Sequence, residues 1–526
     1  MRKHKVDQIR HLLALCSVSR QIGMMEVGDT VTLLLVACAA GLMIFWQQKQ
    51  RQKPGKLPPG PTLLQILGYW LQLKQQGLNK LLTKIREKHG PVFTVNTGQR
   101  QIVFLCDLDS VREALVHQGQ KFSGRAVFNS IDGYFQGHGI AATDGEEWEQ
   151  LRRFSTSTLR NFGMGKRSIE ERVEAEAQHL AEEIGKAEGS PFDPTLIVTH
   201  AVSNVICSIV FGNRFDYKDQ KFLALMNATH GFLVDISSIW SLFCKVFPRT
   251  MQYIPSPHSQ LYHHYKAIHD FIMERVKMNQ QSLDPSCPRD FIDSFLIRME
   301  EEKQNPQSVF KTRNLVDTAI QVFLAGTETT SSTLRYGFLL LVKYPEVQDK
   351  VQEEINRVIG RTHSPAMSDR GRMPYTNAVI HEIQRFANIT PVGIPRRVTC
   401  DTHFQGYFLP KDTDVWTALG MVLQDPKHFK DAGNFHPERF LDEEGRFKKN
   451  DAFLPFSTGK RGCLGKSLAL VELFLMLTTI LQRFTLKSPI PPLEIDLTPT
   501  ESGIVIVPPR FELCALPREE GLQHTA

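Results

Sequence analysis

Residues 456–465, FSTGKRGCLG, place Cys463 in a basic loop bent by glycines, and an apolar stretch with helical composition follows at 466–480. A soft metal ion binds the deprotonated sulfur of cysteine, and nearby cations and helix N-terminal amides favour that form by lowering the pKa of the thiol. Lys460, Arg461 and the start of the helix can supply both influences. The loop therefore predicts a thiolate metal ligand at Cys463.

Two other interpretations of this loop are weaker. A lone buried cysteine usually behaves as a small hydrophobic side chain. Residues 459–467 also look like a phosphate-binding loop, because they end in Gly-Lys-Ser. However, Gly459 lies one residue too far from Gly465 for that motif, and no clear β-run precedes the loop. We therefore reject the phosphate-loop hypothesis.

The spacing Phe-x-x-Gly-x-Arg-x-Cys-x-Gly is complete over residues 456–465. We expect Gly459 and Gly465 to let the main chain approach a flat macrocycle, and Phe456 to shield the sulfur. The pattern resembles the haem-binding loop of the cytochrome P-450 superfamily of haem-thiolate monooxygenases. This resemblance implies haem b (iron protoporphyrin IX) as the cofactor and Cys463 as its iron ligand.

A long apolar helix is predicted over residues 315–342, with the sequence AGTETT at 325–330. Gly326 and the threonines are poor helix formers whose hydroxyls can bond back to preceding carbonyls, so we expect a locally loosened turn. By the resemblance, Thr329 holds oxygen and water by hydrogen bonding, and Glu328 relays protons. A capping or solvent-facing cluster is the alternative, but a buried carboxylate is costly without a role or partners.

A structural ion pair is predicted between Glu382 and Arg385, which are three residues apart on one helix face. By the resemblance, this pair interlocks with Arg439 in the segment FHPERF. Glu354 and Arg357 have the same spacing but lie in the highly charged segment 348–357, which is typical of a solvated helix. We therefore assign the structural role to Glu382 and Arg385, and no catalytic role to either.

The segment WEQLR at 148–152 matches the superfamily's Trp-x-x-x-Arg pattern, and its helical spacing puts Trp148 and Arg152 on one side. In relatives these two residues contact a haem propionate. The resemblance places further propionate partners at Arg125, Arg396 and Arg461, although many members carry histidine where Arg396 stands. A surface charge is the alternative for each arginine considered alone.

The chain has 526 residues, 41% of them hydrophobic, and nine scattered cysteines without paired metal-site spacings. The odd cysteine count favours a reducing compartment over a disulfide framework. Composition shows no internal linker, so we predict one large catalytic domain, most of which is helical with short β-runs. The resemblance implies a mainly α fold with small β-sheets, of the cytochrome P-450 type. The predicted boundaries are an N-terminal extension at 1–23, a membrane anchor helix at 24–47, a basic and proline-rich linker at 48–62, and the haem-thiolate domain at 63–526.

The predicted anchor contains an uncharged apolar run at 31–46, followed by a lysine- and arginine-rich segment. Because positive charge marks the cytosolic side of a span, we expect an endoplasmic reticulum membrane protein whose catalytic domain faces the cytosol. The basic flank and the missing cleavage site count against a cleaved signal peptide. Residues 1–23 carry five cations and one acid, so a mitochondrial address is the alternative.

The net charge of +6 is modest, and no basic motif with interleaved aromatic residues suggests nucleic acid. Basic residues do gather on the candidate proximal surface, where a solvated face is the alternative. By the resemblance they dock an acidic electron donor, namely NADPH cytochrome reductase, a flavoprotein, with a cytochrome b-type protein as a further donor. These residues are Arg153, Arg160, Lys166, Arg167, Lys460 and Lys466.

The segments 160–167 and 325–329 resemble most the vertebrate microsomal members of family two. By that resemblance an apolar pocket is lined by Phe323, Thr327 and the segments 126–135, 232–239, 388–394 and 503–505. For each apolar member, ordinary core packing is the alternative. Mostly apolar segments predict a lipophilic small-molecule substrate, with xenobiotics, fatty acids and steroids all left open.

The preferred function is a monooxygenase that inserts one oxygen atom of O2 into a carbon–hydrogen bond, with electrons derived from NADPH. A haem-thiolate isomerase needs no external electrons, and a non-catalytic haem binder or sensor needs no proton relay. The presence of Glu328 and Thr329 counts against both alternatives.

Overall fold

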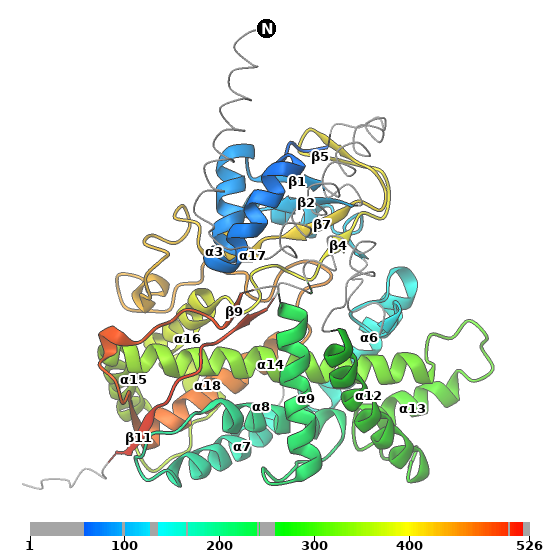
Figure 1. Cartoon of the computed structure of the whole chain (residues 1–526). Helices are drawn as coiled ribbons and strands as arrows, with labels where there is room; N and C mark the ends of the chain where they lie inside the picture. The colour runs from blue at the N-terminus through cyan, green and yellow to red at the C-terminus, as the bar shows by residue number, and fades with distance from the viewer. Residues whose placement is uncertain are drawn as a thin grey trace, which may run out of the picture. The chain divides into compact units, whose positions relative to one another are not determined.

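The computed structural model describes residues 57–96, 100–126, 135–164, 167–238, 241, 258–502 and 505–518 (Figure 1). The predicted extension, the anchor and most of the linker lie outside these residues. Within the described part, no helix is both long and apolar enough to cross a bilayer. The linker's last residues contact the folded unit, because the backbone N–H of Thr94 donates to the carbonyl of Pro59 over 2.9 Å.

Helix α14 (Thr312–Lys343) has 32 residues and is buried along most of its length. It packs against α8 (Thr195–Val210), α18 (Lys466–Arg483) and α16 (Pro374–Ala387), which surround it in Figure 1. The helix ends at Tyr344 because Pro345, which cannot continue the hydrogen-bond ladder, opens the next helix. A helix buried on most sides carries apolar residues around its circumference, which explains the apolar stretches on either side of the polar residues at 327–333.

Other helices pack around this central group, while α3 packs against the first strand of the sheet and against α17. Helices α9 and α12 pack against each other, as do α7 and α18, and α15 and α18. The expectation of a mainly helical fold with small sheets is confirmed. The bounds are α3 (Leu63–His89), α4 (Leu108–Arg112), α6 (Gly145–Asn161), α7 (Arg167–Gly185), α9 (Gln220–Ser237), α12 (His258–Gln281), α13 (Phe291–Glu301), α15 (Pro345–Val358) and α17 (Leu419–Leu423).

A five-stranded sheet has the order β1-β2-β7-β4-β3 and is parallel only between β2 and β7. Its last pair is short, and its register sets Arg125 opposite Arg396. The first two strands lie within residues 92–105. The bounds are β1 (Val92–Asn96), β2 (Gln101–Leu105), β3 (Gly124–Arg125), β4 (Arg396–Arg397) and β7 (Asp414–Thr417).

Three two-stranded sheets and short helical turns complete the described fold. Residues 503 and 504, just before β10, lie outside the described residues. The bounds are β5 (Thr402–Phe404) with β6 (Tyr407–Leu409), β8 (Phe484–Lys487) with β11 (Cys514–Pro517), β9 (Glu501–Ser502) with β10 (Ile506–Val507), and the turns η2 (Glu113–His117), η3 (Met367–Arg372), η4 (Pro437–Phe440) and η5 (Pro492–Glu494).

The predicted ion pair of Glu382 and Arg385 is confirmed as a buried network. Both side chains are fully buried, and two guanidinium nitrogens of Arg385 donate to the two carboxylate oxygens of Glu382, each over 2.7 Å. Arg439 donates to the same carboxylate over 3.0 Å. The remaining guanidinium nitrogen of Arg385 donates to the carbonyls of Leu423 and Ala432 over 3.1 and 2.8 Å. The network thus ties α16 to two segments far along the chain.

The expectation that residues 348–357 form a solvated helix is wrong for one face of α15. Glu354 is 2% exposed and accepts hydrogen bonds from the backbone N–H groups of Tyr375 and Thr376 over 3.1 and 2.7 Å. Its carboxylate therefore satisfies amides at the start of α16, where a helix leaves N–H groups unpaired. Arg357 is exposed, and its contact with Glu354 is 3.4 Å long. The Arg385–Glu382 contact, by contrast, is 2.7 Å long and fully buried.

Replacing Arg385 by leucine should leave the Glu382 carboxylate buried with fewer partners, which costs about 3–5 kcal/mol of unfolding free energy. The matched change Arg357→Leu removes an exposed partner of a buried glutamate and should cost less than about 1 kcal/mol. Denaturant unfolding of the two variants measures both values. Equal losses would contradict the distinction between the two pairs.

Candidate active site

The loop before Cys463 is held by its own backbone. The N–H of Cys463 donates to the carbonyl of Phe456 over 2.9 Å, and the N–H of Gly462 donates to the carbonyl of Gly459 over 3.0 Å. Gly459 has a φ of +74°, and a Cβ there would lie 1.9 Å from the carbonyl oxygen of Leu115, so only glycine fits.

Gly465, unlike Gly459, is not required to be glycine by any described neighbour. It has a φ of −85° and serves as the N-cap of α18. A Cβ there would meet no described atom within 4 Å. Packing within the protein therefore explains one of the two predicted glycines and not the other.

The Cys463 thiol is open to solvent, yet neighbouring protein atoms still desolvate it, and this raises its pKa. Hydrogen bonds from the backbone of Gly465 and Lys466, and the charges of Arg152 and Lys466, oppose the rise but do not outweigh it. The start of α18 thus lowers the pKa as expected, but neither Lys460 nor Arg461 is among the causes, and the net shift of the pKa is upward. Lys460 donates to Gln120. A bound metal ion would supply the missing charge, because it deprotonates a coordinating thiol outright.

The aromatic ring of Phe456 is half-buried at the beginning of the loop, and the Lys466 ammonium lies 5.9 Å from its centroid. Arg152, on α6, holds the other side of the loop because its Nη2 donates to the carbonyl of Gly462 over 2.7 Å. The two predicted residues thus flank the segment that carries Cys463.

The predicted arginines converge on one place from four segments. Arg125 and Arg396 face each other across β3 and β4, and Arg396 donates to the carbonyl of Arg461 over 3.4 Å. The guanidinium carbon of Arg461 lies 4.0 Å from the centroid of Trp148. Arg152 adds a further charge that acts on both Arg396 and Arg461. All five residues predicted as propionate partners therefore belong to this cluster.

The cluster concentrates positive charge away from water. Burial and neighbouring arginines lower the pKa of Arg396 to about 9 and that of Arg461 to about 8, and burial is the larger cause in each. Like charges opposite each other across strands also repel. Guanidinium groups keep their protons in proteins, so such a cluster is stabilised by anions.

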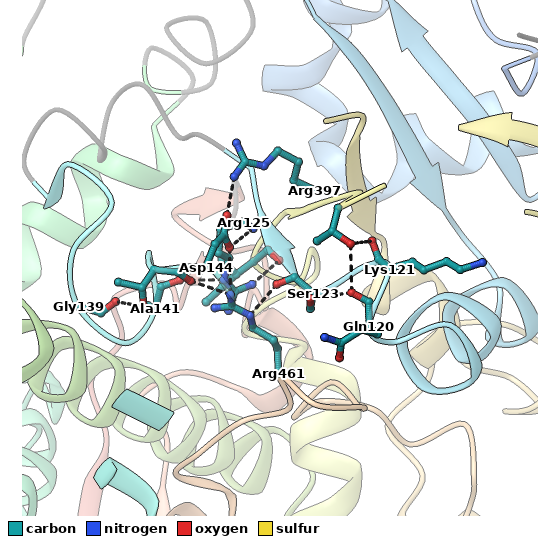
Figure 2. A network of polar contacts seen from close by, with 12 residues as sticks. Gln120, Lys121, Ser123, Arg125, Gly139, Ala141, Asp144, Arg397 and Arg461 are labelled. Atoms are coloured by element: carbon teal, nitrogen blue, oxygen red, sulfur yellow. Dashed lines mark hydrogen bonds and ion pairs between the residues drawn. The ribbon is translucent and has the colours of Figure 1, made fainter. Parts of the chain in front are cut away.

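Asp144 is the residue of this site that sequence reasoning missed (Figure 2). One carboxylate oxygen accepts from the backbone N–H of Arg125 over 2.6 Å and from Nη2 of Arg461 over 3.0 Å. The other accepts from Nη2 of Arg397 over 2.6 Å. The sequence signal is an aspartate just before a helix, which usually caps it. Asp144 occupies that N-cap position, but its side chain makes no capping hydrogen bond to α6.

Arg461 retains one unused donor. Its side chain is 1% exposed, and it donates to the carbonyls of Ser123 and Thr143 over 2.9 and 2.7 Å. Its Nη1 is buried with no hydrogen-bond partner among the described residues. A buried guanidinium nitrogen without an acceptor, in a cluster with excess positive charge, fits the carboxylates of a cofactor. The donor set therefore suits the two propionates of haem.

Thr329 bonds back into its helix as predicted, because its hydroxyl donates to the carbonyl of Ala325 over 2.8 Å. The expected loosening is wrong, since α14 is α-helical throughout. Gly326 serves packing instead, because a Cβ there would lie 2.9 Å from Cγ1 of Ile206 on α8.

Glu328 is 3% exposed, so the alternative of a solvent-facing residue is excluded for it. Burial raises the pKa of its carboxyl to about 7, and the charge of Arg335 on the same helix opposes the rise. Its Oε1 has no hydrogen-bond partner in the described part of the chain. A carboxyl with this pKa can both hold and release a proton near neutral pH.

Ala325 is exposed although it lies in the middle of the otherwise buried α14, one turn before Thr329. Sequence reasoning named Phe323 and Thr327 as pocket residues, but both are fully buried. Phe323 packs against Phe211 with ring centroids 5.9 Å apart. Much of the predicted segment 126–135 and residues 503 and 504 lie outside the described chain.

Comparisons with known proteins agree with this geometry. The profile of the family described as Cytochrome P450 matches residues 58–515. The chain belongs to the cytochrome P450 family. It is 52% identical to "Cytochrome P450 2G1" of Oryctolagus cuniculus over 494 residues, which cover 94% of this chain and 100% of the relative. It is 50% identical to "Cytochrome P450 2A13" of Homo sapiens over 489 residues, 93% of this chain and 98% of the relative.

Membership in the cytochrome P450 family makes the chain a haem-thiolate monooxygenase, and these relatives are family-two members. "Cytochrome P450 2B4" of Oryctolagus cuniculus is 49% identical over 486 residues, 92% of this chain and 99% of the relative. The resemblance drawn from a few short motifs therefore holds over most of the sequence.

Glu328 should make the stability of this cytochrome P450 depend on pH. Its pKa of about 7 in the folded chain exceeds the ordinary 4.5, so the folded state binds more protons between these values. Stability should therefore fall as pH rises from about 4.5 to 7. Glu328→Gln removes the ionising carboxyl. As pH rises through that window, the unfolding free energy of the variant should therefore rise by on the order of 3 kcal/mol relative to that of the parent.

Unfolding by urea at pH 5 and pH 8 measures the difference. The control is Glu149→Gln, because Glu149 is exposed on α6 and its replacement should leave the pH dependence unchanged. The same pH dependence in the parent and in Glu328→Gln would show that this carboxyl is not the titrating group.

Proposed function

We propose that this cytochrome P450 inserts one oxygen atom of O2 into a lipophilic small molecule with NADPH-derived electrons from a flavoprotein reductase. The observation that carries the proposal is the combination of Cys463, the arginine cluster and a buried Glu328 in one chain. A thiolate loop serves haem ligation, and a buried acid with a pKa near neutrality serves proton delivery.

The chain's own residues would bind the cofactor at three points. Cys463 would ligate the iron, and Phe456 would exclude water from the sulfur. Arg461, through its unused Nη1, would bind a propionate together with Arg125, Arg152, Arg396 and the indole N–H of Trp148. Bound haem b would supply the activation of O2 and the oxidising power for the reaction.

Glu328 and Thr329 would move protons on the opposite side of the site. Glu328 holds a proton at neutral pH in part of the molecules, because its pKa is raised to about 7. Thr329 would release its hydroxyl from the carbonyl of Ala325 to position water and oxygen. The exposed Ala325 leaves open space beside this hydroxyl on α14.

The buried acid argues against two other functions. A haem-thiolate isomerase rearranges peroxides without external protons or electrons, and a haem sensor performs no oxygen chemistry. Neither function explains why a carboxyl without a described hydrogen-bond partner is kept inside an apolar helix, where it lowers stability.

The substrate proposal rests on aromatic and apolar residues near the central helix. Phe135 and Phe232 are buried and both lie against Tyr265, with ring centroids 5.6 and 6.5 Å apart. Aromatic and apolar side chains in this region would favour an oily guest, and this composition fits xenobiotics, fatty acids and steroids alike.

The electron donor would bind an exposed basic surface. Arg153 and Arg160 on α6 and Lys466 at the start of α18 are exposed, while Lys166 lies outside the described residues. Arg167 is 90% exposed and Lys460 is exposed beside the loop. An acidic partner would be attracted to such a surface in a salt-dependent manner. NADPH cytochrome reductase and a cytochrome b-type protein are the proposed partners.

We also propose a place in the cell. Residues 24–47 would anchor the chain in the endoplasmic reticulum membrane, with the catalytic domain facing the cytosol. The basic composition of residues 1–23 is the basis for the mitochondrial alternative. No nucleic acid is involved in this proposal.

Cys463→Ser should abolish the long-wavelength absorption band that reduced thiolate-ligated haem gives with carbon monoxide, because a hydroxyl is a poor ligand for this iron. Cys400→Ser is the control, since Cys400 is also an exposed free cysteine but lies outside the loop. Carbon monoxide difference spectra of both purified variants test this. If Cys463→Ser keeps the parent spectrum, the ligand assignment is wrong.

Thr329→Ala should divert reducing equivalents to hydrogen peroxide, with product per NADPH falling about tenfold, as removal of one proton-transfer group typically costs at least that much. Thr333→Ala removes a similar hydroxyl, which donates to the carbonyl of Thr329 over 2.7 Å, and should retain coupling. The measurement compares NADPH consumed, peroxide formed and product formed with reductase present. Unchanged coupling in Thr329→Ala would remove Thr329 from the mechanism.

A further inference from the structure

Asp144 joins three segments that carry the arginine cluster, as Figure 2 shows. It accepts from the backbone of Arg125 at β3, from the side chain of Arg397 at β4, and from the side chain of Arg461 beside Cys463. All three donor–acceptor distances lie between 2.6 and 3.0 Å. These contacts use both carboxylate oxygens, so the side chain is fixed in position and orientation.

Asp144 also brings a negative charge to the positively charged arginine cluster. Among the described residues it is the carboxylate in hydrogen-bond contact with Arg461, whose remaining acceptors there are neutral carbonyls. Arg397 has a second acidic neighbour, Asp412, but that contact is 3.7 Å long and Asp412 is 63% exposed. An exposed charge is screened by solvent, whereas Asp144, with 30% of its side chain exposed, is screened less.

Through Arg461, Asp144 can influence how a ligand binds, because Nη1 of Arg461, unpartnered within the described chain, is free to donate to it. Arg461 is held by three acceptors and by the face of Trp148, so Nη1 has one fixed direction. A donor whose direction is fixed before binding loses little freedom when an anion arrives. The carboxylate at Nη2 also sets how much positive charge the guanidinium presents at Nη1.

We propose that Asp144 is a positioning residue that orients Arg461 and Arg397 and sets the reduction potential of the haem through them. The inference rests on the proposed haem-binding function. A negative charge near the cofactor favours the ferric form, which carries one more positive charge than the ferrous form. Asp144 therefore lowers the potential, and its replacement by asparagine raises it.

The first test compares the potential of purified holoprotein in Asp144→Asn, Asp412→Asn and the parent by spectroelectrochemical titration. Asp144→Asn should shift the equilibrium toward ferrous iron by about three- to tenfold, from loss of one partly screened charge. A tenfold shift corresponds to 59 mV for a one-electron couple. Asp412→Asn removes the same charge from the exposed partner of Arg397 and should leave the potential unchanged.

A second set of variants separates the effect of charge on the reduction potential from the effect of a changed structure. Arg397→Gln removes a positive charge that neutralises one oxygen of Asp144, so the potential should move in the opposite direction, toward ferric iron. The double variant Asp144→Asn with Arg397→Gln should return close to the parent. Asp144→Glu, which restores the charge on a longer side chain, should recover part of the parent potential. A merely structural role would give shifts of one sign in all destabilised variants.

The outcomes are distinguishable from failure of the proposed function. If the parent binds no haem or lacks the thiolate spectrum, the proposed function is wrong. If the parent is a normal haem-thiolate protein and Asp144→Asn has the potential of Asp412→Asn, only the role of Asp144 is refuted. If Asp144→Asn gives no holoprotein, Arg397→Gln decides, and a potential equal to or above the parent's overturns the inference.

Discussion

Buried positive charge that must meet an anion is the constraint on which this structure depends. The register of β3 and β4 sets Arg125 against Arg396, and the Cys463 loop adds Arg461 beside Trp148. In a medium that solvates charge poorly, such a group is stable only with acceptors in place. Backbone carbonyls and Asp144 supply some of these acceptors. Nη1 of Arg461 has no acceptor among the described residues.

A second buried network solves the same problem without a ligand. Arg385 and Glu382 are fully buried, and their donors and acceptors are used within the protein by each other, by Arg439 and by backbone carbonyls. The comparison separates a structural cluster from a binding cluster. Complete pairing stabilises one arrangement of the chain, whereas incomplete pairing of a rigid donor creates affinity for an outside anion.

Helix α14 carries the two residues that we propose for proton transfer. Its continuity holds Glu328 and Thr329 at fixed positions, and its close approach to α8 depends on Gly326. Burial among apolar residues raises the pKa of Glu328 to about 7, while the charge of Arg335 limits the rise. The continuous helix thus fixes the position of this carboxyl, and burial sets its acidity, without a loosened turn.

Local pattern was enough to predict the long helix, the cysteine loop, the Glu382 network and the arginines, because each depends on residue spacing along one segment. It failed where neighbours distant in sequence decide the outcome. Desolvation raises the pKa of Cys463 against the nearby cations, and Glu354 is buried despite its charged segment. Asp144 has the sequence position of a helix cap, yet its carboxylate binds Arg397 and Arg461, hundreds of residues away. The sequence by itself determined the family and the residues proposed for the site, and only the tertiary structure decided their burial, their partners and their charge balance, because these depend on which segments meet in space.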